Sequence, residues 1–296
     1  MFFKSLIFSF LTLSFCLFAD ESSPSYWDYH PLHVGGNFLG IGGAEVTPRS
    51  SSEDGKLYFR KSNLLSFILL PVNETTYFFP RIEWNALTLD WKHNPKFHAT
   101  HFYYLQFGLT LYSIAIEKWR WIARIDFNLD LEHFSQPGPY GLTTGLLWGT
   151  YQIHRKWHYH IGAMAYKGME GQMVYPIIGL DYSPDKKWTF QAVFPVDYSI
   201  QYLAAPWCRL SLKARPLKER FRVGHREPEP GSIFNYSSIG AEFNLHLEKT
   251  RRFEFELYGG YNFGGSFYIK SRGGHRPFYT DLGGAPYAGG HLDYAF

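Results

Sequence analysis

The chain has 296 residues and a formal net charge of +3, and 20% of its residues are aromatic while only 19% are charged. Globular domains average about 25% charged residues, so this composition excludes long disordered tails and charge-rich coiled coils. The near balance of charge also excludes the concentrated basic surface that nucleic-acid binding requires. We therefore predict no nucleic-acid partner.

The first 19 residues have the organisation of a secretory signal peptide. Lys4 precedes an apolar run from Leu6 to Phe18, and Ala19 is followed by Asp20. A positive start, a short apolar core and a small residue at its end are typical of such signals. The run of about 13 residues is shorter than the roughly 20 that a membrane-spanning helix needs. We predict cleavage after Ala19, which leaves residues 20–296 as a single domain.

Beyond the signal, hydrophobicity alternates with a period of two residues. Successive side chains of a strand point to opposite faces, so this period indicates strands with one apolar and one polar face. In the clearest run, Ile125 and Phe127 share the apolar face, and Asp126 and Asn128 share the polar face. The runs in chain order are Tyr103–Leu111, Trp119–Glu132, Trp157–Ala165, Ile239–Glu248 and Arg252–Tyr258.

The connections between these runs are of two kinds. The short breaks are each followed by an aromatic ring: Glu117–Trp119, Arg155–Trp157, Asp185–Trp188, Ala205–Trp207 and Thr250–Phe253. The longer connections are Thr47–Gly55, Lys92–His98, His133–Tyr140, His225–Gly231 and Ser271–Pro286. Outer-membrane barrels have short periplasmic turns, longer extracellular loops and aromatic girdles at both interfaces. We therefore predict an all-β fold, a transmembrane antiparallel up-and-down β-barrel.

The number of strands depends on one hairpin. Pro195 separates the segments 187–194 and 196–203, and proline disrupts a central strand, so we expect about twelve spanning strands, with about ten to fourteen open. Fourteen would form if every segment paired: 33–46, 56–70, 75–90, 100–116, 119–132, 142–154, 157–168, 173–183, 187–194, 196–203, 207–224, 232–247, 252–270 and 287–296.

The last strand ends with Leu292, Tyr294 and Phe296 in alternate positions. This ending resembles the terminal strand of bacterial outer-membrane β-barrel proteins. The resemblance implies the outer membrane of a Gram-negative-type bacterium, contact with its lipid, and recognition of Tyr294 and Phe296 by the barrel-assembly machinery. A weaker resemblance over roughly 173–296, carried by Trp188, Phe194-Pro195, Tyr202 and Trp207, is to an uncharacterised outer-membrane β-barrel domain family, which carries no established activity.

Charged residues concentrate on the polar phase of the strands, which a barrel would turn toward its lumen. Such a face can line a selective pore, or its charges can pair and plug a narrow barrel. About eight strands leave a filled interior and 16–18 leave a channel, so the expected strand number leaves both open. The predicted lumen-facing residues are Arg120, Arg124, Asp126, Asp130, Glu132, Glu242, Glu248, Glu254 and Glu256.

No motif in the sequence points to a cofactor. His158 and His160 share one strand face, but a catalytic metal needs a third ligand, so we interpret them as polar filling of the lumen and predict no metal site. The glycines at Gly35-Gly36 lack the following helix that would hold a phosphate. We also predict no enzyme, although a hydrolase or acyltransferase of lipid or peptide stays a less favoured alternative. The favoured function is a narrow channel or transporter for a small solute, and the second is a non-conducting structural or surface-exposed barrel.

Overall fold

The computed structural model describes residues 31–48, 55–91, 98, 100–224, 227–250, 252–270 and 278–296. The predicted signal peptide at 1–19 lies outside these residues, as do parts of the longer connections predicted at Thr47–Gly55, Lys92–His98, His225–Gly231 and Ser271–Pro286. Within the described part of the chain, no helix has the length and hydropathy to cross a membrane.

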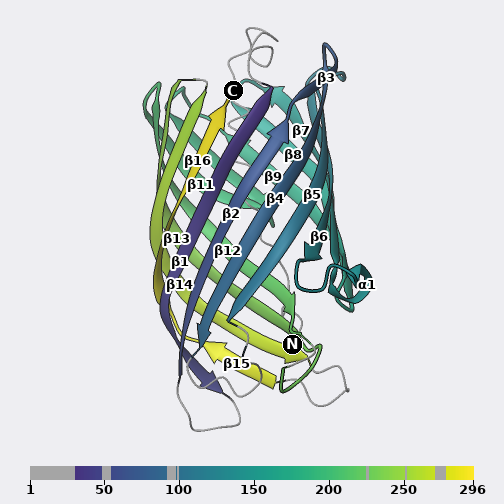
Figure 1. Cartoon of the computed structure of the whole chain (residues 1–296). Coiled ribbons are helices and arrows are strands. Elements are labelled where there is room, and N and C mark those ends of the chain that lie inside the picture. The colour runs from purple at the N-terminus through teal and green to yellow at the C-terminus, as the bar shows by residue number, and fades with distance from the viewer. Residues whose placement is uncertain are drawn as a thin grey trace.

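The described residues form one closed antiparallel β-barrel (Figure 1). Its elements are β1 (Leu32–Pro48), β2 (Gly55–Ile68), β3 (Leu70–Asn73), β4 (Thr76–Trp91), β5 (His101–Ser113), β6 (Trp119–Asp130), α1 (Pro137–Tyr140), β7 (Leu142–His154), β8 (Trp157–Gly168), β9 (Gly171–Tyr182), β10 (Trp188–Phe194), β11 (Asp197–Ala205), β12 (Cys208–Arg222), β13 (Ile233–Thr250), β14 (Phe253–Lys270), β15 (Phe278–Leu282) and β16 (Ala285–Ala295).

Fourteen strands make the wall, each paired with its neighbour along the chain, and β1 closes the barrel against β16. The short strand β3 continues the hairpin of β2 and β4, and β15 lies between β1 and β14. The predicted up-and-down barrel is therefore confirmed. The expected number of about twelve is too low, because β10 and β11 pair over Trp188↔Tyr202 to Val193↔Asp197 and belong to the wall. Pro195 lies in the turn between them, where it removes no ladder hydrogen bond.

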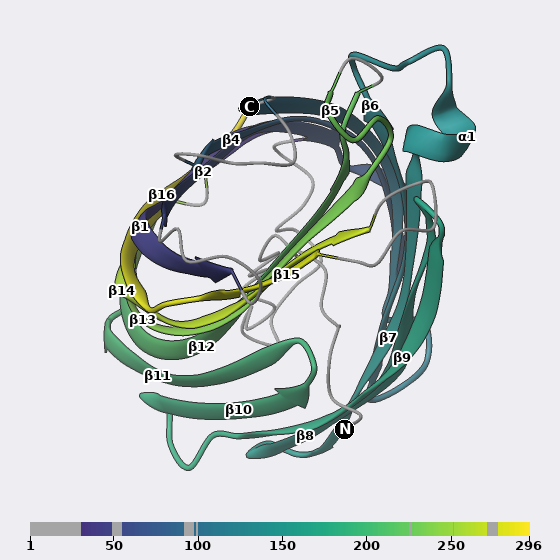
Figure 2. The same ribbon diagram turned by 90° about the horizontal axis from the view of Figure 1, so that it is seen from below.

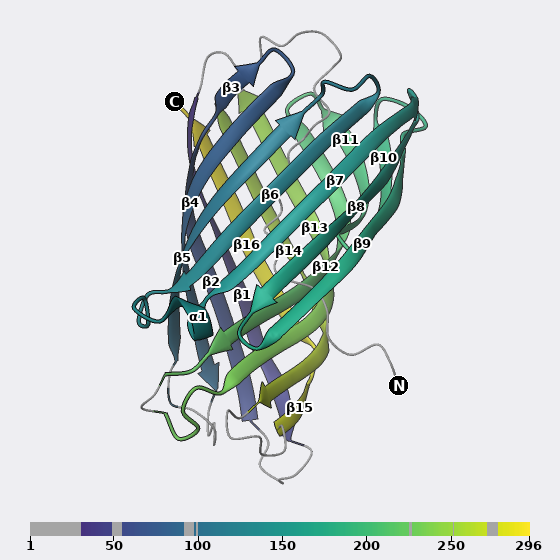
Figure 3. The same cartoon turned by 90° about the vertical axis from the view of Figure 1, so that its right-hand side faces the viewer.

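The two ends of the barrel differ in their connections (Figures 1 and 3). We call the end with the connections 114–118, 155–156, 183–187, 206–207 and 251–252 the turn end. Both ends of the wall meet there, since the backbone N–H of Phe296 donates to the carbonyl of Leu32 (2.8 Å). The opposite end, the loop end, carries the longer connections, but also the tight turn Met169-Glu170 between β8 and β9.

Apolar side chains cover the outer face of the barrel. On β6, Ile125 and Phe127 are 40% and 43% exposed while Asp126 is buried, and on β5 the exposed apolar side chains are Phe107, Leu109 and Leu111. A soluble sheet would turn its apolar face inward. An apolar outer face around a closed wall matches strands that cross a bilayer.

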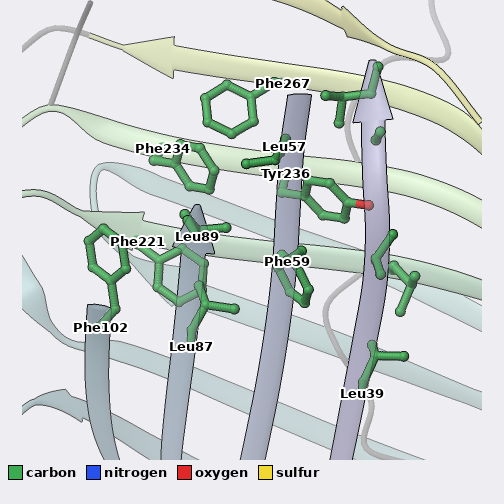
Figure 4. Close-up of a cluster of buried hydrophobic side chains, with 14 of the residues drawn as sticks. Leu39, Leu57, Phe59, Leu87, Leu89, Phe102, Phe221, Phe234, Tyr236 and Phe267 are labelled. Carbon is green, nitrogen blue, oxygen red and sulfur yellow. The ribbon is translucent and has the colours of Figure 1, made fainter. Parts of the chain in front are cut away.

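The loop-end half of the interior contains a hydrophobic core (Figure 4). The loop-end halves of β12, β13 and β14 cross behind β1, β2, β4 and β5, and Figure 2 shows the same strands cutting across the ring of the barrel. Ring centroids lie 5.3 Å apart between Phe102 and Phe221, and 5.0 Å apart between Phe59 and Tyr236. Opposite walls thus pack like two stacked sheets, roughly 10 Å apart, and the barrel is flattened at this end.

The outward orientation of Ile125 gives a testable contrast with Asn128 on the other face of β6. We expect Ile125→Arg to lower the free energy of unfolding by about 2–4 kcal/mol, because the charge enters hydrocarbon. Asn128→Arg should cost less than half as much, because Asp126 and Asp130 flank it one pleat away on the same face. Urea titration in lipid vesicles measures both, and equal costs would show that the two faces are misassigned.

Candidate functional site

The candidate site is the polar interior, which occupies the remainder of the inner face. Barrel interiors in the outer membrane are polar, and polar groups buried there are stable only when they are paired. The buried members are Asn63, Arg81, Glu83, Asn85, Gln106, Asp126, Asp130, His158, His160, Asp181, Ser199, Ser211, Glu242, Asn244, His246 and Glu256.

One ion cluster joins β4 and β6 across the intervening strand. The Arg81 Nη2 lies 3.0 Å from Asp126 Oδ1, and Arg124 Nε donates to Asp126 Oδ2 (2.6 Å). Gly108 on β5 pairs with both Arg81 and Asp126, and a Cβ added there would collide with both side chains. The glycine therefore lets the two charged groups meet. Thr144 adds a hydroxyl donor to Asp126 (3.3 Å).

The same cluster extends to Glu83. Asn63 Nδ2 donates to Glu83 Oε1 (2.7 Å), and Arg81 Nη2 lies 3.8 Å from Glu83 Oε2. Arg81, Glu83 and Asn63 were not among the residues predicted from sequence. Arg81, Glu83 and Asn85 occupy alternate positions of β4, so the period-two rule could have placed them together.

A second cluster joins β12, β13, β14 and β16. Arg215 grips the Glu242 carboxylate with both Nε and Nη2, the latter at 2.8 Å from Oε1. The guanidinium lies over the ring of Tyr258 (4.3 Å), and the hydroxyl of Tyr287 donates to Glu242 (3.2 Å). Lys213 is 3.6 Å from Glu256, which also accepts a hydrogen bond from Asn244. Buried acid and base are thus matched within the cluster.

His246, Glu254 and Glu256 bring three potential metal-ligand atoms within 4.8 Å of one another. His246 and Glu256 are cross-strand partners, and His246 Nδ1 lies 3.5 Å from Glu254. This group could not be predicted from sequence, because its members meet only through the register of β13 and β14. Lys213 already supplies a positive charge to Glu256 at this place.

The two histidines singled out from the sequence lie on the inner face of β8. Nδ1 of His160 accepts a hydrogen bond from the Trp148 indole N–H (3.0 Å), and its Nε2 lies 2.9 Å from the Asp181 carboxylate. Thr150 is within 3.1 Å of the same Nδ1. His158 is buried beside it. His160 is therefore part of a hydrogen-bonded group, consistent with polar filling.

The remaining predicted site residues lie near the strand ends. Arg120 is half-buried near the start of β6, and Asp130 is buried at its end, where it accepts hydrogen bonds from the backbone N–H of Glu132 (2.8 Å) and His133 (3.2 Å). Glu132 is exposed beyond the strand. At the turn end, Glu248 lies 3.9 Å from His246.

Tyr294 and Phe296, the predicted assembly signal, are exposed with their rings 4.7 Å apart. The predicted lumen-facing residues thus fall into separate groups on different walls. Arg124 and Asp126 meet on β6, whereas Glu254 and Glu256 lie side by side on β14.

Arginines of β12 hold the β8–β9 turn at the loop end. Arg220 donates to the carbonyl of Met169, and Arg222 Nη2 donates to Glu170 (2.9 Å) while its Nη1 donates to the carbonyl of Gly231 (2.8 Å). Lys270 lies 3.2 Å from Glu170. The hydrogen bond from Arg222 lowers the pKa of Glu170 below its ordinary value. We call these contacts the arginine clamp.

The role of Asp126 in the β4–β6 cluster can be tested directly. Asp126→Asn removes the carboxylate charge that two buried guanidinium groups share, so we expect the free energy of unfolding to fall by about 3–5 kcal/mol. Glu132→Gln makes the same kind of change at an exposed side chain and is the matched control. It should change the free energy of unfolding by less than about 0.5 kcal/mol. Adding Arg124→Gln to Asp126→Asn should recover part of the loss. An unchanged unfolding midpoint for Asp126→Asn would show that this cluster does not stabilise the barrel.

Among solved structures, the chain is similar to the crystal structure of the COG4313 outer membrane channel from Pseudomonas putida F1. The TM-score is 0.51 at 9% sequence identity, over 93% of this chain and 100% of that chain. A likeness at this identity concerns the fold alone. The comparison thus supports the closed antiparallel β-barrel fold.

The sequence relatives are proteins of chlamydiae. An uncharacterised protein of Chlamydia trachomatis is 23% identical over 227 residues, which cover 71% of each chain. One of Chlamydia pneumoniae is 28% identical over 154 residues, and the match spans 51% of this chain and 48% of the relative. The model of a family described as a domain of unknown function, DUF6268, matches residues 93–294. Because this match covers more than half of the barrel, the chain belongs to the DUF6268 family.

Proposed function

We propose that the protein is a narrow channel for a small solute across the outer membrane of a Gram-negative-type bacterium. The observation that carries this proposal is the closed wall with apolar side chains outside and paired charges inside. The apolar outer face is what a bilayer requires. Buried charges are costly to desolvate, so a barrel that conducts nothing gains little from a charged interior.

The interior supports a narrow path over a wide one. Fourteen strands are fewer than the 16–18 of open porins, and the hydrophobic core at the loop end occupies part of the section. The ion clusters line the opposite half. A solute in this channel is therefore small.

The second candidate is a barrel that conducts nothing. The direct contacts between Phe102 and Phe221 across the interior favour it, because they close part of the loop end. The two candidates differ in one measurable property, the passage of ions.

Single-channel recording in planar bilayers separates them. We expect a conductance below that of 16–18-stranded porins, and an increase of at least about twofold for the double variant Phe102→Ala, Phe221→Ala, because conduction follows the width of the constriction. The control Phe107→Ala, Phe243→Ala removes two exposed rings from the outer face and should leave the conductance unchanged. Silence of the wild-type protein would favour the non-conducting barrel.

The proposed route to the membrane uses the terminal strand, with the barrel-assembly machinery as partner. We expect deletion of Phe296 to lower the folded yield in the outer membrane, by about tenfold if recognition is lost (about 1.4 kcal/mol of binding). Heat-modifiable migration on gels measures the folded fraction. The control is Phe263→Ala, which removes an exposed ring from a different strand, β14. Normal yield after the deletion would contradict recognition of this end.

A further inference from the structure

The barrel wall has a break beside the short hairpin of β10 and β11. β10 pairs with β9 only from Ile178 to Tyr182, and β11 pairs with β12 only from Cys208 to Ala214. In the described sheet, residues 171–177 of β9 and 215–222 of β12 therefore have a strand neighbour on one side alone. Figure 3 shows β10 and β11 beside the turn-end half of the wall. On the loop-end side of the turn between β10 and β11, the wall therefore has no strand between β9 and β12.

The hydrogen-bond alternation identifies which backbone groups face this break. Ser183 donates to the carbonyl of Lys156 (2.9 Å), so the odd-numbered residues of β9 bond to β8. Val223 donates to the carbonyl of Ser232 (2.9 Å), so the odd-numbered residues of β12 bond to β13. Because alternate residues of a strand point to opposite neighbours, the even-numbered residues of both strands face the break.

Each edge of the break has a proline at such a position. Pro176 on β9 and Pro216 on β12 are even-numbered, so their backbone nitrogens face the break. Because proline has no N–H, neither nitrogen can donate a hydrogen bond across it. Proline is excluded from strands paired on both sides and is found at edges. It also prevents an edge from pairing with another strand. The sequence therefore encodes two edges here, and they cannot join as a regular ladder.

The break lies at the height of the membrane. Val174 and Ile178 on β9 are 69% and 64% exposed and belong to the apolar outer face. Backbone groups without partners are not tolerated in hydrocarbon, and at membrane depth they occur only when buried in protein or lining a wet cavity. The unpaired edges of β9 and β12 must therefore face either packed side chains or a wet cavity.

The inner surface next to the break differs from the polar walls. Met164, Tyr175, Ile177 and Val193 form a separate hydrophobic cluster there, with Val196 of the hairpin tip packed against it. Farther toward the turn end, the inner positions of β8 and β9 carry His158, His160 and Asp181 instead. The inner side chains next to the break are therefore apolar and packed against one another, in contrast with the polar walls.

Two further features bear on the route through the interior. The hydrophobic core fills the loop-end interior on the side of β1–β5, so the straight path along the axis is restricted. The arginine clamp fixes the β8–β9 turn to β12 at the loop end of the break. The clamp bounds the opening and keeps its two edges at a set separation.

We propose that the break between β9 and β12 is a lateral passage, through which small apolar molecules move between the barrel interior and the membrane. This inference rests on the proposed channel function and assigns it a solute class. The passage is bounded by the hairpin tip at Pro195 and Val196, by the edges at Pro176 and Pro216, and by the arginine clamp.

The open edge itself can be measured by amide hydrogen exchange of the full protein in lipid nanodiscs. Val174 and Ile178 lie on the same face of β9, but only Ile178 has a partner on β10, Phe194. We expect the amide of Val174 to exchange at least about 100-fold faster than those of Ile178 and Tyr175, because only opening of the ladder exposes the latter two. Equal protection of Val174 and Ile178 would overturn the break.

Passage can be tested with the dye N-phenyl-1-naphthylamine, which fluoresces when it reaches the membrane interior. Lys218→Cys places a thiol on the edge of the break, and Leu212→Cys places one on the same phase of β12 where the strand pairs with Ile200. Both are made with Cys208→Ser and modified with a benzyl methanethiosulfonate. We expect the modification to slow dye uptake by cells at least fivefold at position 218 and to leave it unchanged at position 212.

The outcomes separate this inference from the proposed function. Dye uptake that is faster than in cells lacking the protein, and that modification slows at 218 alone, supports the lateral passage. Uptake that responds equally at both positions or at neither overturns it. Ion conductance in bilayers without accelerated dye uptake also overturns the passage and leaves the channel standing. Absence of both conductance and uptake would overturn the channel as well.

Discussion

The structure depends on one constraint, that backbone N–H and C=O groups facing hydrocarbon must be hydrogen-bonded within the protein. A closed barrel meets it because each strand has two neighbours, and β1 meets this need through its ladder with β16, from His33↔Ala295 to Ile41↔Tyr287. The same constraint applies at the break, where the β9–β10 and β11–β12 ladders end. In a soluble sheet, water can bond to the backbone groups of an unpaired edge. At membrane depth, the same groups must be covered by protein or must face a water-filled cavity.

Charge and packing divide the interior under the same constraint. Where opposite walls stay apart, charged side chains reach along the wall to neighbouring strands, as Arg81 reaches Asp126 over Gly108. Where β12–β14 cross the interior, rings such as Phe221 and Phe234 meet the rings and leucines of the opposite wall. One barrel thus combines a polar half typical of channels with an apolar half typical of a sandwich.

The strands could be predicted from sequence because period two is a local property. The segments 142–154 and 157–168 were located to the residue, and the facing of Ile125 against Asp126 followed from the same rule. The hairpin at Pro195 was underestimated because the rule cannot tell a turn proline from one inside a strand. The core around Phe221 was not foreseen, since alternation shows which residues share a face but not which wall lies opposite. Pairs such as His246 with Glu256 need the register, which only the folded barrel supplies.

The seam between β1 and β16 has a consequence for the time course of folding. Apart from the short pairing of β1 with β15, the other strand pairs of the barrel are local in sequence. At this seam, by contrast, the side chains of His33 and Asp293 meet although they are 260 positions apart. Contacts of such separation form slowly, because the entropy of closing the loop precedes any gain from pairing. Hairpins such as β7–β8 pair residues that are close in sequence and can therefore form earlier. The edge of β1 that pairs with β16 therefore stays open until β16 docks against it, after the local hairpins have formed.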